Sequence, residues 1–311
     1  MSNASIDLTK TAVRTIDGTA AAPPRSRAAT LLRAAETTYL AVITVAAAFV
    51  AYLGFVAPKR MDEAFTWADL PPLHARFVAS LYLFGAVYVG ACMVTRRRAQ
   101  VGPVYGGIIT FTGLLFTLTM LNLKAFDFDL APVWVWTVSY IVYPILGVVL
   151  VVWIARSGQS GPQERVADRA VAPWARRSMQ GIAATVGLTG LLLLVARDLM
   201  VDMWPWKVST GLAQFYAAPV LAVAFCAWRY STRTTWRSLR TITPALLVLG
   251  VATLASSLVH RALFDVSDVS DVVWFAGFGL LTLISAALCV GAFGRNPAEP
   301  EAQPLSRQPP M

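Results

Sequence analysis

The apolar residues of this chain fall into eight stretches of about 20 residues, and none of these stretches contains Asp, Glu, Lys or Arg. A helix rises 1.5 Å per residue, so each stretch is long enough to cross a hydrocarbon core of about 30 Å. The stretches are continuously apolar, whereas a strand of an outer-membrane barrel alternates over about ten residues. The pattern therefore predicts transmembrane helices at Thr37–Ala57, Phe77–Thr95, Val101–Leu123, Pro132–Ala155, Ser178–Ala196, Val208–Trp228, Thr241–His260 and Val272–Gly294.

The composition supports this interpretation. The 311 residues are 57% hydrophobic and 14% charged, with a mean hydropathy of +0.59, whereas a typical soluble domain is about 25% charged. Cys92, Cys226 and Cys289 lie inside predicted spans without the spacing of a metal motif, so we expect them to be packing residues. The sequence predicts an all-α integral membrane protein.

Polar segments divide the chain into five parts. The first 35 residues are polar, and the segment beyond Arg295 is short and rich in proline. We expect a disordered cytoplasmic tail at 1–35, a first four-helix transmembrane unit at 36–156, a cytoplasmic linker at 157–177, a second four-helix unit at 178–294 and a disordered cytoplasmic tail at 295–311.

The basic residues predict how the chain is oriented. With the amino terminus in the cytoplasm, 19 of the 26 Lys and Arg residues fall in cytoplasmic segments, and ten of the 17 acidic residues fall outside. Cytoplasmic loops of membrane proteins carry such an excess of basic residues. We therefore expect a multi-pass protein of the plasma membrane with both termini in the cytoplasm, and we attribute the net charge of +9 to topology rather than to nucleic-acid binding.

The two halves of the chain resemble each other. A shift of 139 residues aligns the first four predicted helices with the last four, without gaps from about residue 55 to 155, and it pairs Met61 with Met200 and Trp67 with Trp206. A four-helix unit begins and ends on the same side of the membrane, so the two repeats are expected to be parallel. A central site would then lie between the halves.

The tryptophans and glycines predict packing. Tryptophans near the ends of spans are typical of an aromatic belt at the membrane interface. Glycines within spans predict close approach of neighbouring helices. They occur at Gly85, Gly90, Gly102, Gly106, Gly107, Gly113, Gly181, Gly187 and Gly190.

One outer loop carries a motif, Phe65-Thr-Trp-Ala-Asp-Leu-Pro-Pro-Leu-His-Ala-Arg76. A shorter, partial copy of this motif begins at Trp204-Pro-Trp206. It resembles a motif of uncharacterised multi-pass membrane proteins of high-GC, actinobacterial-type bacteria. The likeness covers two short stretches, and the second copy lacks the ending that leads to Arg76. The resemblance implies membership of such a group and no particular activity.

The outer loops also hold the candidate interaction site, which comprises Asp62, Trp67, Arg76, Asp127 and Trp206. Arg76 lies in the first turn of a helix, where its charge meets the positive end of the helix dipole, so we expect it to have a partner. The candidates are Asp62, Glu63, Asp127, Asp129, or an anionic lipid or substrate headgroup.

Other chemistry has weaker support. Acidic residues precede the fourth and eighth predicted helices, at Asp127, Asp129, Asp265, Asp268 and Asp271, and are consistent with an outer cation site or with helix capping, which we favour. Asp62-Glu63 is similar to the acidic pair of polytopic lipid-linked-sugar glycosyltransferases, but its loop is too short to support an outer domain. His74 and His260 are too few for a haem or zinc site. The sequence therefore predicts no catalytic, cofactor-binding or metal-ligating residue.

Three classes of function remain. Coupled transporters usually keep ionisable groups at membrane depth, and the predicted spans contain no Asp, Glu, Lys or Arg. We favour an accessory or assembly protein that interacts with membrane lipids or with a membrane-protein partner. The alternatives are a passive or weakly coupled permease for a small apolar or lipid-like molecule and, third, an intramembrane enzyme acting at the outer face. An open polar cavity between the halves would favour the permease.

Overall fold

The computed structural model describes residues 27–95, 98–157 and 169–294, and these ranges contain helices and no β-strand. Short helical segments lie between the long helices: η1 (Pro58–Arg60), α2 (Met61–Ala64), η2 (Leu123–Ala125), α7 (Arg197–Asp202), α9 (Trp236–Leu239) and η3 (Arg261–Leu263). The long helices are α1 (Arg27–Val56), α3 (Pro72–Thr95), α4 (Arg98–Leu121), α5 (Ala131–Arg156), α6 (Pro173–Val195), α8 (Thr210–Ser231), α10 (Ile242–Val259) and α11 (Val269–Phe293).

Each of these eight long helices is long and apolar enough to cross a membrane. The shortest, α10, has 18 residues, which correspond to about 27 Å at the rise of an α-helix. The structure therefore confirms the prediction of an all-α, multi-pass membrane protein with eight spans.

Several helices begin before the predicted segments. α3 begins at Pro72, five residues before the predicted Phe77, so Arg76 is its fifth residue and lies beyond the first turn. α1 begins at Arg27, within the predicted tail, because the stretch from Arg27 to Ala35 is rich in Ala, Leu and Arg, which favour helix. α6 begins at Pro173, where a proline suits the first helical position because its missing N–H has no intrahelical acceptor. The disorder predicted for 1–26 and 295–311 lies outside the described residues.

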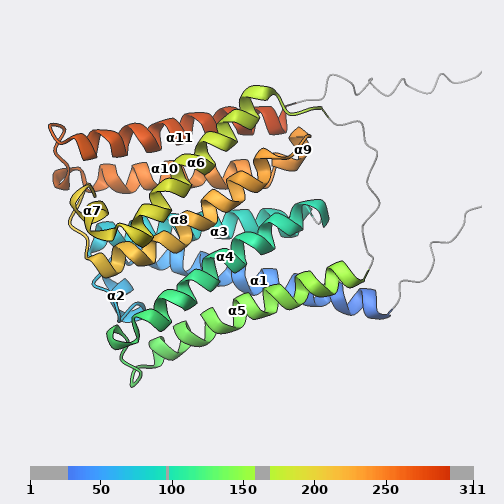
Figure 1. The fold of residues 1–311 in the computed structure, drawn as a ribbon, viewed down its shortest axis with the longest axis horizontal. Coiled ribbons are helices and arrows are strands. Elements are labelled where there is room, and N and C mark those ends of the chain that lie inside the picture. Colours follow the sequence, from blue (N-terminus) through green and yellow to red (C-terminus); the bar gives the residue numbers. More distant parts are fainter. Residues whose placement is uncertain (1–26, 96–97, 158–168, 295–311) are drawn as a thin grey trace, which may run out of the picture.

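Four long helices are central and four are peripheral (Figure 1). The central helices are α3, α4, α8 and α10. Within the most apolar 18-residue window of each helix, 67% of the residues are buried in central α8 but only 17% in peripheral α5. Each peripheral helix packs mainly on one central helix: α1 on α3, α5 on α4, α6 on α8 and α11 on α10.

The central helices pack mainly across the two halves of the chain. α3 packs on α10 and α4 packs on α8, whereas α3 makes few contacts with α4, and α8 makes few with α10. The helices of each half therefore do not close into a separate bundle. The two halves are interleaved, and each needs the other to cover its central helices.

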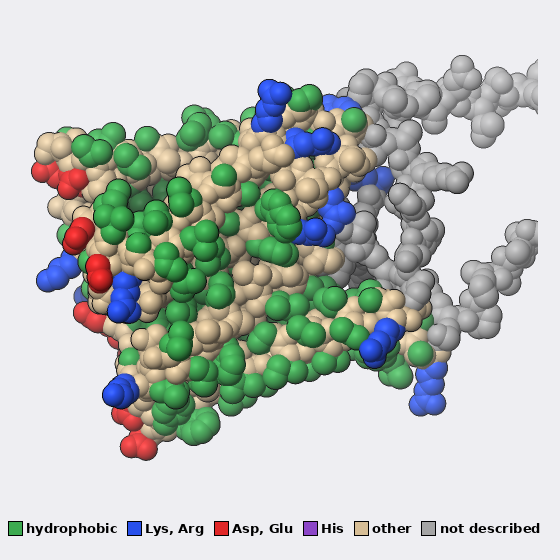
Figure 2. Space-filling view, in the orientation of Figure 1, with side chains coloured by type: hydrophobic (Ala, Val, Ile, Leu, Met, Phe, Trp, Pro, Cys, Tyr) green, Lys and Arg blue, Asp and Glu red, His purple; other side chains and the backbone are tan. Residues whose placement is uncertain are grey.

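The two ends of the molecule differ in composition. The aromatic end consists of the connections 57–71, 122–130, 196–209 and 260–268, and the terminal end is where α1 begins and α11 ends (Figure 1). Acidic side chains gather at the aromatic end (Figure 2). Of the acidic residues in the described ranges, only Glu36 lies towards the terminal end.

At the terminal end, two arginines bind the last carbonyl groups of α11. Arg169 donates a hydrogen bond to the carbonyl of Gly291, and its guanidinium lies 5.3 Å from the ring centre of Trp236. Arg240 Nε donates to the carbonyl of Ala292 over 2.7 Å. The end of a helix carries partial negative charge, so these cations stabilise α11.

We expect Arg240→Ala to lower the free energy of unfolding by about 1.5–3 kcal/mol, because it removes a hydrogen bond from a charged donor. Equilibrium unfolding in mixed detergent micelles measures this change. Arg176→Ala, at an exposed position of α6, is the control and should change it by less than about 0.5 kcal/mol. An equal loss in both variants would contradict the capping role of Arg240.

Candidate functional site

The connection between α1 and α3 carries the predicted residues Asp62 and Trp67. Met61 and Leu70 anchor this connection, since 0% and 1% of their surfaces are exposed. The Asp62 carboxylate accepts a hydrogen bond from the backbone N–H of Leu70 over 2.9 Å. Asp62 therefore closes the loop on itself and so fixes the position of Trp67.

Trp67 lies in a cluster of rings that joins the two halves. Its ring centre is 4.3 Å from that of Phe215 on α8, 4.8 Å from that of Trp136 on α5 and 5.4 Å from that of Phe126. Such distances are typical of favourable aromatic pairs. With Phe65, these rings form what we call the first aromatic cluster.

A second aromatic cluster surrounds Trp206. Its ring centre lies 4.7 Å from that of Trp274 on α11, 6.0 Å from that of Phe264 and 5.7 Å from that of Phe77 on α3. With Trp204, these rings form the second aromatic cluster. Phe77 belongs to the first half of the chain and Phe215 to the second, so each cluster receives one ring from the opposite half.

The contacts of the two clusters correspond in detail. Trp136 Nε1 donates to Thr119 Oγ1 over 3.0 Å, and Trp274 Nε1 donates to Ser257 Oγ over 3.0 Å. Both residues of the second pair follow those of the first by 138 residues, whereas Trp206 follows Trp67 by 139. The offset of this pair of hydrogen bonds is therefore one residue shorter than the offset that relates Trp67 to Trp206.

We expect Trp136→Phe and Trp274→Phe to cost similar amounts of stability, about 1 kcal/mol each, because each removes one hydrogen bond from an indole and leaves a hydroxyl without its donor. Equilibrium unfolding in mixed micelles compares the two. Trp134→Phe is the control, because that indole is 53% exposed and its hydrogen bond lies at the surface. Clearly unequal losses at 136 and 274 would contradict the equivalence of the clusters.

The tryptophans of both clusters lie inside the protein rather than in a belt that faces the membrane interface. Trp136, Trp204 and Trp206 are 8–9% exposed, so the belt interpretation is wrong for them. The indole N–H groups of Trp67, Trp204 and Trp206 are buried and have no hydrogen-bond partner within the described residues. Buried polar groups of this kind usually have a partner, which makes these three donors notable.

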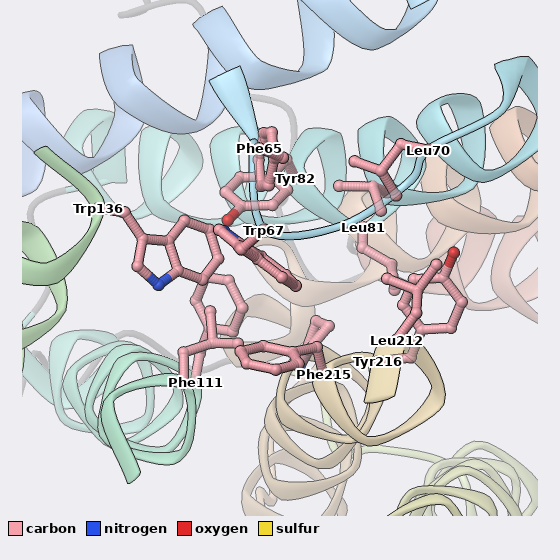
Figure 3. Close-up of a pocket in the computed structure, with 13 residues that line it drawn as sticks. Phe65, Trp67, Leu70, Leu81, Tyr82, Phe111, Trp136, Leu212, Phe215 and Tyr216 are labelled. Carbon is pink, nitrogen blue, oxygen red and sulfur yellow. The ribbon is translucent and has the colours of Figure 1, made fainter. Parts of the chain in front are cut away.

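A cavity of about 30 Å³ adjoins the first aromatic cluster between α3, α4, α5 and α8 (Figure 3). Its walls include Trp67, Phe111, Phe215 and Leu212, and the hydroxyl of Tyr82 pairs with that of Tyr140 over 2.5 Å beside it. A cavity of this volume has room for a water molecule or two. Rings from both halves meet around this cavity, since Phe215 of α8 packs on Trp67.

Arg76 contacts a histidine of the other half. Its Nη1 donates a hydrogen bond to Nε2 of His260, which follows the last turn of α10. Within the described ranges, no carboxylate pairs with Arg76. Burial, and next the charge of Arg76, hold the pKa of His260 below its ordinary value, so the imidazole is neutral and can accept the hydrogen bond.

The other histidine also joins the halves. His74 Nδ1 lies 2.8 Å from the hydroxyl of Tyr216, and its Nε2 lies 2.9 Å from the carbonyl of Lys207. The carbonyl can only accept, so Nε2 carries the proton and Nδ1 accepts from Tyr216. Sequence reasoning gave neither pair, because the partners lie 133 to 184 residues apart.

The five predicted residues make different contacts. Trp67 belongs to the first aromatic cluster and Trp206 to the second, and Arg76 precedes Phe77 of the second. Asp62 and Asp127 make local turns, since Asp127 Oδ1 accepts from the backbone N–H of Asp129 over 3.0 Å. The grouping of these residues as one interaction site stays a prediction.

A comparison of the chain with protein-family models, curated proteins and solved structures finds no match.

The aromatic end offers apolar rings, hydrogen-bond donors such as the unpaired indoles, and acidic side chains. In the described part of the chain, no three His, Cys, Asp or Glu side chains gather as a metal site would require. Asp268 is the N-cap of α11 and accepts from the backbone N–H of Ser270 over 2.9 Å, as the capping interpretation predicts. Hydrogen bonds from the backbone and side chain of Ser267 hold the pKa of Asp265 below its ordinary value. These rings and polar groups can bind a lipid or a protein partner by packing and hydrogen bonds.

Proposed function

We propose that the protein is an accessory or assembly component of the membrane that binds lipid or a membrane-protein partner through its aromatic end. The observation that carries this proposal is the filled surface between the halves. The two clusters occupy the region where a permease of this design would open a polar path. A rigid, ring-filled end is suited to holding a partner, because aromatic side chains lose little conformational entropy when they bind.

The proposal includes the orientation of the chain. We place the aromatic end outside the plasma membrane and the terminal end, with both termini, in the cytoplasm. The gathering of acidic side chains at the aromatic end and the arginines at the terminal end support this placement (Figure 2). A reporter that is active only in the cytoplasm should be active when fused after Met311, and a reporter that is active only outside the membrane should be inactive there.

We also propose that the halves arose by duplication of a four-helix unit. The support is the pairing of helices, in which α1 with α3 matches α6 with α8 and α4 with α5 matches α10 with α11, together with the matched indole hydrogen bonds. We also keep as a proposal the resemblance of the loop motif to that of actinobacterial-type membrane proteins. This resemblance implies no particular activity.

A passive permease is the second candidate. The cavity beside Trp67 favours it, because this cavity lies between helices of both halves and has the Tyr82 hydroxyl at its edge. At about 30 Å³ the cavity is far smaller than a small-molecule site, which typically has 300 Å³ or more. Transport through it requires the clusters to separate.

The test is affinity purification of the full chain in native lipid nanodiscs, followed by identification of bound proteins and lipids. A stoichiometric protein partner or one enriched lipid supports the proposed role, and Trp67→Ala or Arg76→Ala should reduce that association. Trp134→Ala is the control because it changes an exposed tryptophan outside both clusters. If Trp67→Ala and Arg76→Ala leave association, localisation and growth unchanged, the role of the aromatic end is wrong.

A further inference from the structure

Arg76 has more hydrogen-bond donors than the protein satisfies. A guanidinium carries five N–H donors, and within the described residues Arg76 makes one side-chain hydrogen bond, to His260. The side chain is only partly exposed. A neutral imidazole is a weak partner for a guanidinium, whose planar geometry matches the paired oxygens of an oxyanion.

The residue after Arg76 packs on two tryptophans whose indole donors are unpaired. Phe77, the next residue, packs against Trp204 and Trp206 at 5.9 and 5.7 Å between ring centres. These two tryptophans are 9% and 8% exposed, and their indole N–H groups have no acceptor in the described part of the chain. Trp206 also packs on Phe264, four residues beyond His260.

The corresponding position in the other half is apolar. A shift of 139 residues relates Arg76 to Phe215, whose ring packs on Trp67 in the first aromatic cluster. By this shift, the first half has a cation where the second half has a ring. Packing alone is satisfied by phenylalanine at this position, so packing does not account for the arginine.

We propose that Arg76 and His260 form a binding site for a phosphate group at the aromatic end, between α3 and α10. The proposal rests on the lipid-interacting role proposed above and names the chemical class of the ligand. The phosphate oxygens accept hydrogen bonds from Arg76 and from protonated His260. In the absence of phosphate, Arg76 donates to neutral His260 instead. The source of the phosphate is either the headgroup of an anionic lipid or free phosphate.

The charged groups around His260 set the pH dependence. On α3 these are Arg76 and His74, and His74 is already held by Tyr216 and Lys207. Arg261 follows His260 on η3. On the segment that leads into α11, Asp265 accepts from Ser267, and Asp271 accepts from the backbone N–H of Asp265. Binding of an anion therefore favours protonation of His260, and affinity should rise as the pH falls.

The test uses the full chain, purified in dodecylmaltoside and depleted of lipid. One arm measures the thermal midpoint against added sodium phosphate, with sodium chloride at equal ionic strength as reference. The other arm measures retention of phosphatidylglycerol and phosphatidylcholine by native mass spectrometry. Stabilisation by phosphate assigns the site to free phosphate, and preferential retention of phosphatidylglycerol assigns it to a lipid headgroup.

The variants decide whether the site is the one proposed. Arg76→Gln should weaken binding about tenfold or more, because it removes a charge-assisted pair. Arg197→Gln, at an exposed position of the same end, should leave binding unchanged. His260→Gln should abolish the gain in affinity between pH 7.5 and pH 5.5. If Arg76→Gln does not fold, Arg76→Lys, which keeps the charge but not the paired geometry, should bind several times more weakly than the natural chain.

The proposal is overturned if the natural chain binds neither probe, or if it binds them as tightly after substitution of Arg76 as before. That result leaves the proposed function standing when the nanodisc purification still finds a protein partner. Conversely, phosphate binding that depends on Arg76 without any enriched partner or lipid supports the site and removes the accessory role.

Discussion

Gly54→Leu is expected to prevent the stable packing of α1 on α3. A Cβ atom at Gly54 lies 2.6 Å from the carbonyl oxygen of Ala75 and 2.7 Å from Cβ of Ala79. The carbonyl belongs to the backbone of α3 and cannot rotate away, so the helices must move apart. We expect a loss of about 3 kcal/mol or more of unfolding free energy, at the upper end for overpacked sites.

A matched substitution on α3 controls for the size of the added side chain. A Cβ atom at Gly85 meets nothing within 4 Å, so Gly85→Leu should change the unfolding free energy by less than about 1 kcal/mol. Equilibrium unfolding in mixed micelles measures the loss of stability in both variants, and the yield of monodisperse protein shows whether each variant folds. Similar losses at the two positions would show that α1 does not approach α3 as the structure has it.

Cutting the chain after Gly161 should give two fragments that fold only together. Each half leaves its central helices uncovered, because α3 packs on α10 and α4 packs on α8. Within the membrane such packing is the main source of helix association. We expect the fragments to purify as a one-to-one complex when produced together and to accumulate poorly when produced alone.

Tagging either fragment and measuring recovery of the other tests this expectation. The Gly54→Leu substitution is not suited as a control here, because it acts within one half. Gly107→Leu is more informative, because the Cβ atom added on α4 lies 2.5 Å from Sγ of Cys226 on α8 of the other fragment. A first fragment that is monodisperse and stable by itself would contradict the interleaved arrangement.

The spans could be predicted because they follow from one property, the length of uncharged apolar runs. The partners of the helices could not. A helix that faces lipid on one side and protein on the other is apolar on both, so the sequence gives no periodicity that marks its packed face. α5 is an example, because it is apolar all round and yet largely exposed.

The glycines show the same limit. Gly106, Gly107 and Gly190 are sites of close approach, as predicted, since their Cβ atoms would meet Phe225, Cys226 and Leu221. Gly85, Gly102, Gly113 and Gly181 have nothing within 4 Å. A glycine permits close approach but does not show that a neighbour is there.

The candidate site was anticipated in its residues and not in its geometry. Trp67, Trp206 and Arg76 were singled out from the loop motif, and all three contact the opposite half. Their partners, Phe215, Phe77 and His260, lie on distant helices whose proximity depends on the interleaving. The carboxylates suggested for Arg76 are held by their own loops instead, as Asp62 and Asp127 show.

Interleaving also imposes an order on biosynthesis. α10 follows α3 by about 150 residues, and translation proceeds at about 5–20 residues per second, so α3 waits roughly 7–30 s for its main partner from the other half. During that interval the nascent first half sits in the membrane with the surface that α10 later covers still facing lipid or the insertion machinery. Assembly of this protein is therefore complete only when the last pair of helices has been inserted.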